Sequence, residues 1–335
     1  APSPHSRRPL ARLRAERRIK VSSWLRVATR AVESILVDSG IAARLAVSRK
    51  RTRAVLAFHN ICQPDAVHAG DTSLHMRVDA FAELISQLKR RVAIVSLAEL
   101  LRPSTPTRGM QVAITFDDAY VGAIEHGLSV LRSLSCPSTV FVAPGLLGQS
   151  STWWDEAAQQ QHGAMPSAQR DEWLDGPAGG SGDAIRAGSA EWTYPRLPPD
   201  HAIADATRMV SAARTSGVTL ASHTWSHINV AAVASAAAND HARREQLEAE
   251  LRRPLEWLRA QPGDTLNMLA YPYGRWNARA EEAARAAGYE AAFRVDGGAL
   301  SDAPAADALF ALPRINVPSL MRANGVLMRM SGLRA

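Results

Sequence analysis

Short apolar runs alternate with longer amphipathic stretches between residues 54 and 330. The apolar runs end at polar or turn-forming residues, which is typical of strands. They predict strands at 54–61, 92–96, 111–116, 138–143, 218–222, 268–271, 291–295 and 311–317. The stretches between them predict helices near 79–90, 121–133, 201–215, 240–260 and 278–287, the last of them closed by Gly288 in the C-terminal capping position. Alternation of this kind favours a parallel sheet with helices packed outside it.

Residues 149–200 interrupt this alternation with a glutamine run, a Gly-Gly-Ser-Gly segment and several prolines. Such a stretch predicts a long insertion, or a lid, on the α/β scaffold. It also contains Trp153 and Trp154. Because aromatic faces pack on sugar rings, these side chains can line a sugar-binding cleft, or they can anchor the insertion to the core. The pattern alone leaves both interpretations open.

The charge is concentrated at the beginning of the chain. Residues 1–53 hold 14 Lys/Arg and 3 Asp/Glu, which leaves 25 basic and 29 acidic residues out of the totals of 39 and 32. We therefore divide the chain into a basic leader, 1–53, and a mildly acidic body, 54–330. The leader predicts a helical arm that packs on the body, and peripheral contact with an anionic membrane is an alternative; nucleic acid is the less favoured partner.

Composition sets wider limits. With 335 residues and 46% hydrophobic residues, the chain can bury a large core as one domain or two. No apolar run approaches the ~20 residues of a membrane span, and no clear signal peptide is visible, so we favour a cytoplasmic or membrane-peripheral location. The two cysteines, Cys62 and Cys136, have no metal-type spacing and predict two buried thiols rather than a disulfide framework.

Two of the predicted strands end on clusters of polar residues. Asp117 and Asp118 follow the run that ends at Phe116, and His223 and His227 follow the run that ends at Ala221. One carboxylate and two imidazoles can hold a divalent ion, most readily Zn²⁺, with coordination positions left for water and substrate. Alternatively, the histidines are ordinary core or surface residues, and Asp118 caps a helix.

Adjacent side chains on a strand point to opposite faces, so both carboxylates cannot reach one ion from a regular strand. The loop after the strand must turn, which makes one acid a metal ligand and leaves the other as a base for a water molecule. The other histidines have no partner at metal-binding spacing, and we expect solvated or helix-face positions for them: His5, His75, His126, His162, His201 and His241.

The motifs Thr115-Phe116-Asp117-Asp118, Ser222 to His227 and Tyr271-Pro272-Tyr273-Gly274 resemble, in order and spacing, those of the polysaccharide deacetylase family. This family is also called the NodB-homology domain or carbohydrate esterase family 4. Residues 55–60 are similar to the first strand of many members. The resemblance covers roughly residues 54–318 and leaves the basic leader outside.

The resemblance implies a distorted (β/α) barrel with fewer strands than the eight-stranded form, here carrying a long insertion and a basic helical N-terminal arm. It also implies metal-dependent removal of N- or O-acetyl groups from sugars. By position in the motifs, Asp117 is the base, and Asp118, His223 and His227 are the metal ligands. The backbone N–H of Tyr273 is expected to donate to the oxyanion, in a segment that Pro272 and Gly274 make rigid.

The chain departs from the family pattern twice. Many members place an arginine just before the Pro-Tyr-Gly segment to orient the base, where this chain has Ala270-Tyr271. They also carry a Leu-x-His motif whose histidine protonates the leaving amine, and the matching segment here has Arg314 in its place. Arginine stays protonated and is a poor general acid. We hypothesise that Arg314 reaches Asp117 and replaces the missing orienting arginine.

The leaving-group proton must then have another source. Asp117 can return the proton that it takes from water, or His59 can donate one. An alternative for His59 is a buried histidine at the end of a strand, satisfied by backbone groups. We also expect His59, Tyr271 and the two adjacent tryptophans to contact substrate.

Together these features predict a carbohydrate deacetylase, a hydrolase of carbon–nitrogen bonds other than peptide bonds. Its expected substrate is a polysaccharide or lipid-linked glycan with N-acetyl groups, attacked by a water molecule that the metal and Asp117 activate. Two alternatives remain: a deformylase or other amide hydrolase on a small or lipid-linked substrate, and a non-catalytic, metal-containing glycan-binding relative.

Overall fold

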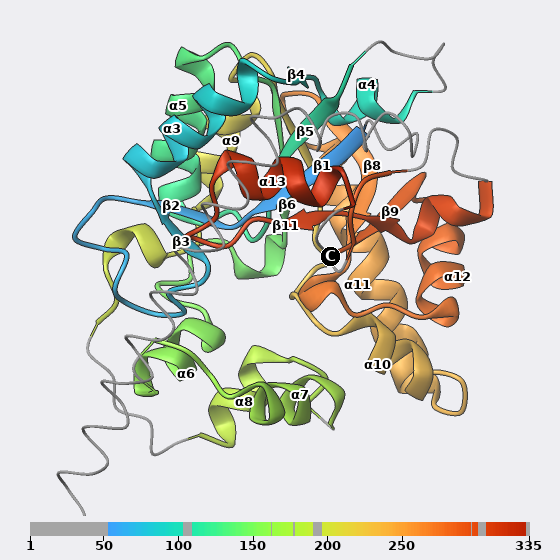
Figure 1. Ribbon diagram of the computed structural model, residues 1–335. Coiled ribbons are helices and arrows are strands. Elements are labelled where there is room, and N and C mark those ends of the chain that lie inside the picture. Colours follow the sequence, from blue (N-terminus) through green and yellow to red (C-terminus); the bar gives the residue numbers. More distant parts are fainter. Residues whose placement is uncertain are drawn as a thin grey trace, which may run out of the picture.

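The computed structural model describes residues 53–102, 109–161, 163–176, 178–189, 196–295, 297–300 and 306–332. Its centre is a parallel sheet whose strands follow the order β10-β9-β8-β7-β6-β5-β1-β11, with β4 paired to β5 (Figure 1). The bounds of these strands are β1 Arg53–Phe58, β4 Ala93–Ile94, β5 Gln111–Phe116, β6 Ser138–Val142, β7 Val218–Ser222, β8 Thr265–Ala270, β9 Ala291–Arg294, β10 Leu312–Pro313 and β11 Ile315–Asn316. The predicted parallel sheet is confirmed. The predicted helical leader lies outside the described residues.

The segment at 312–316 brings the two edges of the sheet together. Leu312 pairs with Phe293 of β9, and Ile315 pairs with Leu56 of β1. The sheet is thus nearly closed into a barrel, which confirms the distorted α/β barrel. The predicted strand at 311–317 is divided by Arg314, the residue between β10 and β11. β10 and β11 are consecutive in the chain, so the single stretch 312–316 fills the gap between β9 and β1. The barrel is therefore built from fewer separate strands than an eight-stranded barrel.

Alternation along the strands places side chains on the two faces of the sheet. Val55, Ala113, Phe141 and Phe293 belong to a smaller buried cluster that fills the barrel. Their neighbours along the strands join a larger cluster with the outer helices. The same alternation that directs Ala113 inward also directs Asp117 inward, at the carboxyl end of β5.

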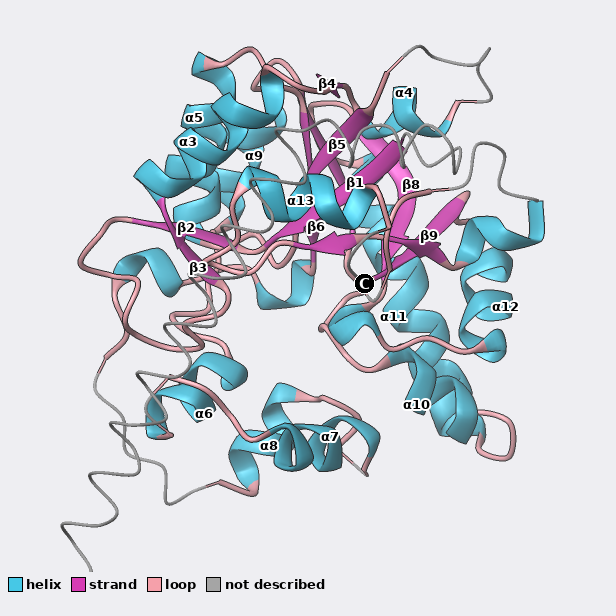
Figure 2. Ribbon diagram, viewed as in Figure 1, coloured by secondary structure: helices cyan, strands magenta, loops and turns pink. Residues whose placement is uncertain are grey.

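The predicted helices are present outside the sheet (Figures 1 and 2). The outer elements are α3 Val78–Lys89, α4 Leu97–Leu101, the π-helix η2 Ala123–Gly127, α5 Leu128–Ser133, α9 Ala206–Ala213, α10 Val230–Ala236, α11 His241–Arg259, α12 Ala278–Ala287 and α13 Ala323–Met330. α12 ends at Gly288, whose φ of 103° is the left-handed conformation expected of a C-terminal cap. The predicted helix at 201–215 begins later than expected, because Asp205 caps α9.

The described residues of the stretch 149–200, between β6 and β7, form three short α-helices at one end of the barrel (Figure 1): α6 Trp153–Gln160, α7 Ser167–Asp175 and α8 Gly182–Ala187. They share a small apolar cluster of their own that includes Trp153, Leu174 and Ile185. Nearby, the predicted first strand stops at His59, and the chain continues as β2 Asn60–Cys62, which pairs with β3 His75–Arg77 in a separate two-stranded sheet.

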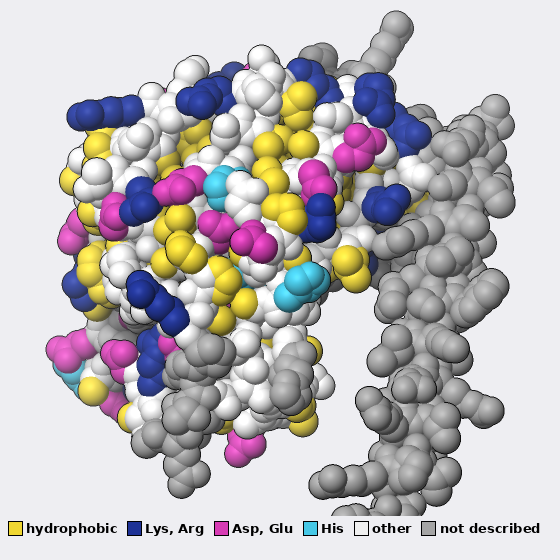
Figure 3. All heavy atoms as spheres, turned by 90° about the vertical axis from the view of Figure 1, so that its left-hand side faces the viewer, with side chains coloured by type: hydrophobic (Ala, Val, Ile, Leu, Met, Phe, Trp, Pro, Cys, Tyr) yellow, Lys and Arg dark blue, Asp and Glu magenta, His cyan; other side chains and the backbone are white. Residues whose placement is uncertain are grey.

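No helix among the described residues is both long and apolar enough to cross a membrane. On the face of the molecule shown in Figure 3, acidic and basic side chains of the described residues are interspersed.

Candidate functional site

The loops after β5, β7 and β8 carry an unusual backbone conformation. Of the six non-glycine residues with positive φ in the described part of the chain, five lie in these loops: Asp118, Ala119, Thr224, His227 and Tyr273, with φ between 59° and 69°. Left-handed conformations are uncommon for residues with a side chain, and such strain concentrates at functional sites. The loops thus hold their side chains in positions that a relaxed backbone would not give.

Asp118, His223 and His227 converge at the carboxyl end of the sheet. Asp118 Oδ1 lies 3.0 Å from His227 Nε2 and 3.4 Å from His223 Nε2. The two Nε2 atoms are 3.1 Å apart. His223 Nδ1 lies 2.7 Å from the carbonyl oxygen of Ala270, so its proton belongs on Nδ1 and Nε2 keeps its lone pair toward the cluster. The three groups are placed as predicted from the sequence.

This cluster has the chemistry of a divalent cation site. All three residues are 2–4% exposed, and Asp118 Oδ1 is buried without a hydrogen-bond partner although His227 Nε2 is close. Burial alone would raise the pKa of Asp118, but the adjacent histidines outweigh burial and hold this pKa well below its ordinary value. One carboxylate oxygen and two imidazole nitrogens fit a zinc-like ion that keeps open coordination positions.

Asp117 lies beside this cluster, and Arg314 holds it from inside the barrel. Arg314 donates from both terminal nitrogens to the two carboxylate oxygens, each at 2.7 Å. It also donates to Thr115 Oγ1 at 3.3 Å, and the guanidinium lies 5.1 Å from the ring centre of Phe141. Burial would raise the pKa of Asp117, but the charges of Arg314 and His223 outweigh burial and lower it. Arg314 therefore does reach Asp117, as the sequence led us to hypothesise.

The predicted turn around Tyr273 is also at the site. Its ring centre is 4.5 Å from that of His227, and its hydroxyl donates to the carbonyl oxygen of Gly180 at 3.1 Å. The same hydroxyl accepts the indole N–H of Trp153 at 3.0 Å. The insertion is therefore joined to the loop after β8 directly above the cluster.

Both tryptophans of α6 are buried, and both belong to the roof of the site. The ring of Trp154 lies 4.6 Å from that of His227, and its indole N–H donates to Tyr120 Oη at 2.7 Å. Trp153 and Trp154 are 2% and 7% exposed. Their placement agrees with the anchoring interpretation, since neither ring is a free surface for a sugar.

Two predicted substrate contacts lie in different surroundings. His59 is partly exposed at the end of β1, and its charge contributes to lowering the pKa of Asp117. It is therefore not the fully buried histidine of the alternative interpretation. Tyr271 is fully buried and donates to the carbonyl oxygen of Phe310 at 3.0 Å. Because it follows the inward-facing Ala270, its side chain joins the outer core, and the structure does not bring it to the site.

One supporting residue of the site gives no signal in the sequence. Glu250 of α11 accepts hydrogen bonds from the backbone N–H groups of Trp225 and Ser226, at 3.1 and 2.9 Å, and from the Ser226 hydroxyl. Burial raises the pKa of Glu250 despite these bonds. The residue fixes the loop that carries both histidines, but in the sequence it stands among other charged residues of α11 and looks like a solvated one.

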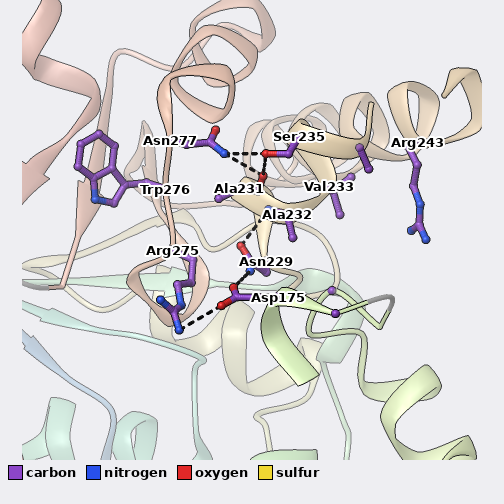
Figure 4. Close-up of a pocket in the computed structure, with 13 residues that line it drawn as sticks. Asp175, Asn229, Ala231, Ala232, Val233, Ser235, Arg243, Arg275, Trp276 and Asn277 are labelled. Atoms are coloured by element: carbon purple, nitrogen blue, oxygen red, sulfur yellow. Dashed lines mark hydrogen bonds and ion pairs between the residues drawn. The ribbon is translucent and has the colours of Figure 1, made fainter. Parts of the chain in front are cut away.

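A cavity of about 560 Å³ lies between the end of α7, the start of α10 and the turn after β8 (Figure 4). Asn229, two residues after His227 in the sequence, is one of its lining residues. Asn229 Nδ2 donates to Asp175 Oδ1 at 3.2 Å, and Arg275 pairs with Asp171 at 2.5 Å. Trp276 and Asn277 contribute further lining. Amide, charged and aromatic groups thus surround a hollow next to the loop of the histidines.

Comparison with known proteins decides the family. The family model described as polysaccharide deacetylase matches residues 104–292, more than half of the chain, and this range includes Asp117, Asp118, His223, His227 and Tyr273. The chain belongs to the polysaccharide deacetylase family. The protein is therefore a carbohydrate deacetylase, a hydrolase of a family that acts on acetylated polysaccharides. A search of curated proteins found no match.

Solved structures share the fold of this deacetylase. A deacetylase from Streptococcus pyogenes, PplD in complex with acetate, has 18% identity and a TM-score of 0.54, covering 83% of this chain and 97% of its own. IcaB from Ammonifex degensii has 17% identity and a TM-score of 0.56, covering 84% and 97%. A de-N-acetylase from Aggregatibacter actinomycetemcomitans has 13% identity and a TM-score of 0.52, covering 82% and 98%. At these identities the likeness concerns the fold alone.

Proposed function

We propose that this deacetylase removes N-acetyl groups from amino sugars of a polysaccharide or a lipid-linked glycan, with a divalent metal, most suitably Zn²⁺, at Asp118, His223 and His227. The observation that carries the proposal is the two-pronged contact of Arg314 with Asp117 next to the three converging ligand atoms. An ion held there supplies Lewis-acid activation of water and of the amide carbonyl.

Asp117 acts as the base in this proposal. Arg314 binds both of its oxygens, but each carboxylate oxygen keeps a further lone pair, so Asp117 can accept a proton from the attacking water. The guanidinium fixes the plane of the carboxylate and keeps it ionised, because its charge opposes the effect of burial on the pKa of Asp117. In this proposal Arg314, between β10 and β11, replaces the missing family arginine.

The remaining steps use groups at the rim of the site. The backbone N–H of Tyr273 donates to the oxyanion that forms on the acetyl carbonyl. His59 protonates the leaving amine, which is supported by its partial exposure and its electrostatic interaction with Asp117. The bond between nitrogen and the acetyl carbon breaks, and acetate and the free amine leave. The cavity beside Asn229 gives room for neighbouring sugar units.

Acetate release from N-acetylated glucosamine oligomers tests this proposal. We expect turnover with zinc, loss of turnover on chelation, and a loss of about 10²–10⁴-fold in kcat for Asp117→Asn, because the base is removed while the shape is kept. Asp183→Asn, an exposed carboxylate at the start of α8, is the matched control and should keep full activity.

Three results would overturn the proposal. Formate release from formylated amino sugars without acetate release would identify a deformylase. Glycan binding without any turnover in metal-loaded protein would identify a binding relative. Full activity of Asp117→Asn would remove this carboxylate from the reaction. Attachment of the basic leader to an anionic membrane, and the cellular location, stay predictions from the sequence.

A further inference from the structure

A second group of metal-type ligands lies outside the site described above. Cys62 of β2, His75 of β3 and His201 of the 3-10 helix η4 (Pro199–His201) each offer a ligand atom, and these atoms all lie within 4.8 Å of one another. The three residues are 0–1% exposed. The expectation that His75 and His201 are solvated or helix-face residues is therefore wrong, because folding brings the paired strands β2 and β3 together with η4 in the interior.

His201 offers a bare nitrogen. Its Nε2 donates to the carbonyl oxygen of Ala69 at 3.2 Å, so Nδ1 carries a lone pair, and Nδ1 is buried without a hydrogen-bond partner. A proton on the far nitrogen, held by a carbonyl, is the arrangement usual for histidines that bind metal. Burial, reinforced by the neighbouring His75, lowers the pKa of His201 to about 4, so the imidazole is neutral at neutral pH.

His75 is supported in the way that metal-binding histidines are. Its Nε2 lies 2.9 Å from Asp155 Oδ1, an arrangement in which a carboxylate fixes the orientation of the ring. Its Nδ1 accepts from Asn60 Nδ2 at 3.1 Å, and the same amide donates to the carbonyl oxygen of Asp200 at 3.0 Å. A cation that takes the Nδ1 lone pair displaces one donor, and Asn60 keeps its bond to Asp200.

Cys62 supplies the sulfur. Burial, and then the charges of Asp200 and Asp155, raise the pKa of its thiol far above its ordinary value, so without a cation the sulfur keeps its proton. A divalent ion reverses this balance, because a thiolate bound to a cation is no longer an isolated buried charge.

We propose that Cys62, His75 and His201 form a second metal site, which takes a thiophilic divalent ion such as Zn²⁺. Binding replaces the S–H bond of Cys62 by a metal–sulfur bond and releases one proton to solvent, and no electron is transferred. The ion ties the two-stranded sheet β2–β3 to the segment that returns from the insertion. Through Asp155 it also orders α6, whose Trp154 contacts His227.

Co²⁺ added to the metal-free chain of residues 1–335 tests this site. Cobalt bound by a thiolate gives a charge-transfer band in the near ultraviolet, whereas cobalt at Asp118, His223 and His227 has no sulfur ligand and gives none. We expect the band in the native protein and in a His223→Ala variant that has lost the catalytic ion. We expect its loss in Cys62→Ser and its retention in Cys136→Ser, a matched control in which the other buried thiol is removed.

A second variant keeps the test decisive if Cys62→Ser does not fold. His201→Gln keeps the thiol but removes the bare nitrogen. Because loss of a partner that only supports a ligand costs about 10- to 100-fold, loss of the ligand should lower the cobalt affinity read from the band by at least about 10-fold in protein whose circular dichroism is native. Absence of the band in native protein with excess cobalt would overturn the proposal. So would an affinity unchanged by His201→Gln, or a band that survives in Cys62→Ser. Failure of this proposal is distinguishable from failure of the proposed function, because the acetate assay depends on Asp118, His223 and His227, which are different ligands.

Discussion

At the scale of single residues, Arg314 takes part both in the segment that closes the barrel and in the contact that holds Asp117. It interrupts the segment that closes the barrel, and it is fully buried with its charge paired to Asp117. A buried guanidinium without its carboxylate would lower the free energy of unfolding by several kcal/mol, so neither member of the pair can be removed alone without a large loss of stability. The fork geometry also sets the plane in which Asp117 presents its lone pairs, which links the closure of the barrel to the base that we propose for the reaction.

Arg314→Lys should separate charge from geometry. Lysine keeps the positive charge but makes a single-point contact, so the carboxylate loses its fixed plane while remaining ionised. We expect kcat for acetate release to fall about 10²-fold with a smaller change in KM, because misplacement of a reacting group acts mainly on the transition state. Steady-state kinetics on an acetylated oligomer measures both constants.

The control for this change is Arg186→Lys in the insertion. Arg186 also contacts a carboxylate through two nitrogens, at 2.9 and 3.2 Å from the oxygens of Glu156, but it lies outside the reacting groups. The kcat of the Arg186→Lys variant should equal that of the native protein. An Arg314→His variant with an unchanged rate and an unchanged pH–rate profile would show that Arg314 takes no part in the reaction.

At the scale of elements, α6 connects the roof of the site to the body through one buried carboxylate. Asp155 accepts hydrogen bonds from Tyr120 Oη at 2.8 Å and from the backbone N–H of Asp71 at 2.8 Å, and it lies 2.9 Å from His75 Nε2. Tyr120 in turn accepts from Trp154. The position of Trp154 over the site therefore depends on a network that begins at β3.

Asp155→Asn should reduce stability in a pH-dependent way. Burial would raise the pKa of Asp155, but His75 outweighs burial and lowers it, so the carboxylate stabilises the fold above its unfolded pKa of about 3.9. This contribution is lost as pH falls below about 3.9 and through the lower pKa that Asp155 has in the folded state. We expect a loss of about 3 kcal/mol at pH 7 and a smaller difference from the native protein at about pH 2, measured by urea unfolding.

Asp183→Asn again provides the control, because this exposed carboxylate has no buried partners and should change the free energy of unfolding by less than about 0.5 kcal/mol at either pH. If Asp155→Asn loses the same free energy of unfolding at both pH values, the loss comes from the altered hydrogen-bonding geometry of the amide and not from the missing charge. Native stability at pH 7 would contradict the role of Asp155 as the anchor of α6.

At the scale of the whole molecule, the barrel and the catalytic cluster follow from patterns that are local in the sequence. Apolar runs mark the strands, and the residues that end parallel strands meet at one edge, which is why Asp118 and His223 were predicted to be neighbours. The group of Cys62, His75 and His201 could not be predicted, because its members come from separate segments without a shared period. Tyr271 was misplaced because a shift of one residue along a strand reverses the face.

The cluster at Asp118 also joins the barrel as a whole. Its ligands follow β5 and β7, which are separated in the sheet by β6, so an ion bound there holds the ends of three adjacent strands together. A ligand that binds only the folded state stabilises it by RT ln(1 + L/Kd), where L is the free ligand concentration, and this is about 4 kcal/mol when L is a thousand times Kd. Zinc should therefore raise the midpoint of thermal unfolding by several degrees.

Two adjacent isosteric changes, made in a Cys62→Ser background that removes the sulfur ligand, test this expectation. Asp118→Asn replaces a ligand, so the rise in Tm with zinc should be largely lost. Asp117→Asn leaves all three ligands in place, so the rise should persist although acetate release is lost. Equal responses of Tm to zinc in the two variants would contradict the division of labour between the neighbouring carboxylates. A difference confined to Asp118→Asn would show that this carboxylate holds the ion while Asp117 handles the proton.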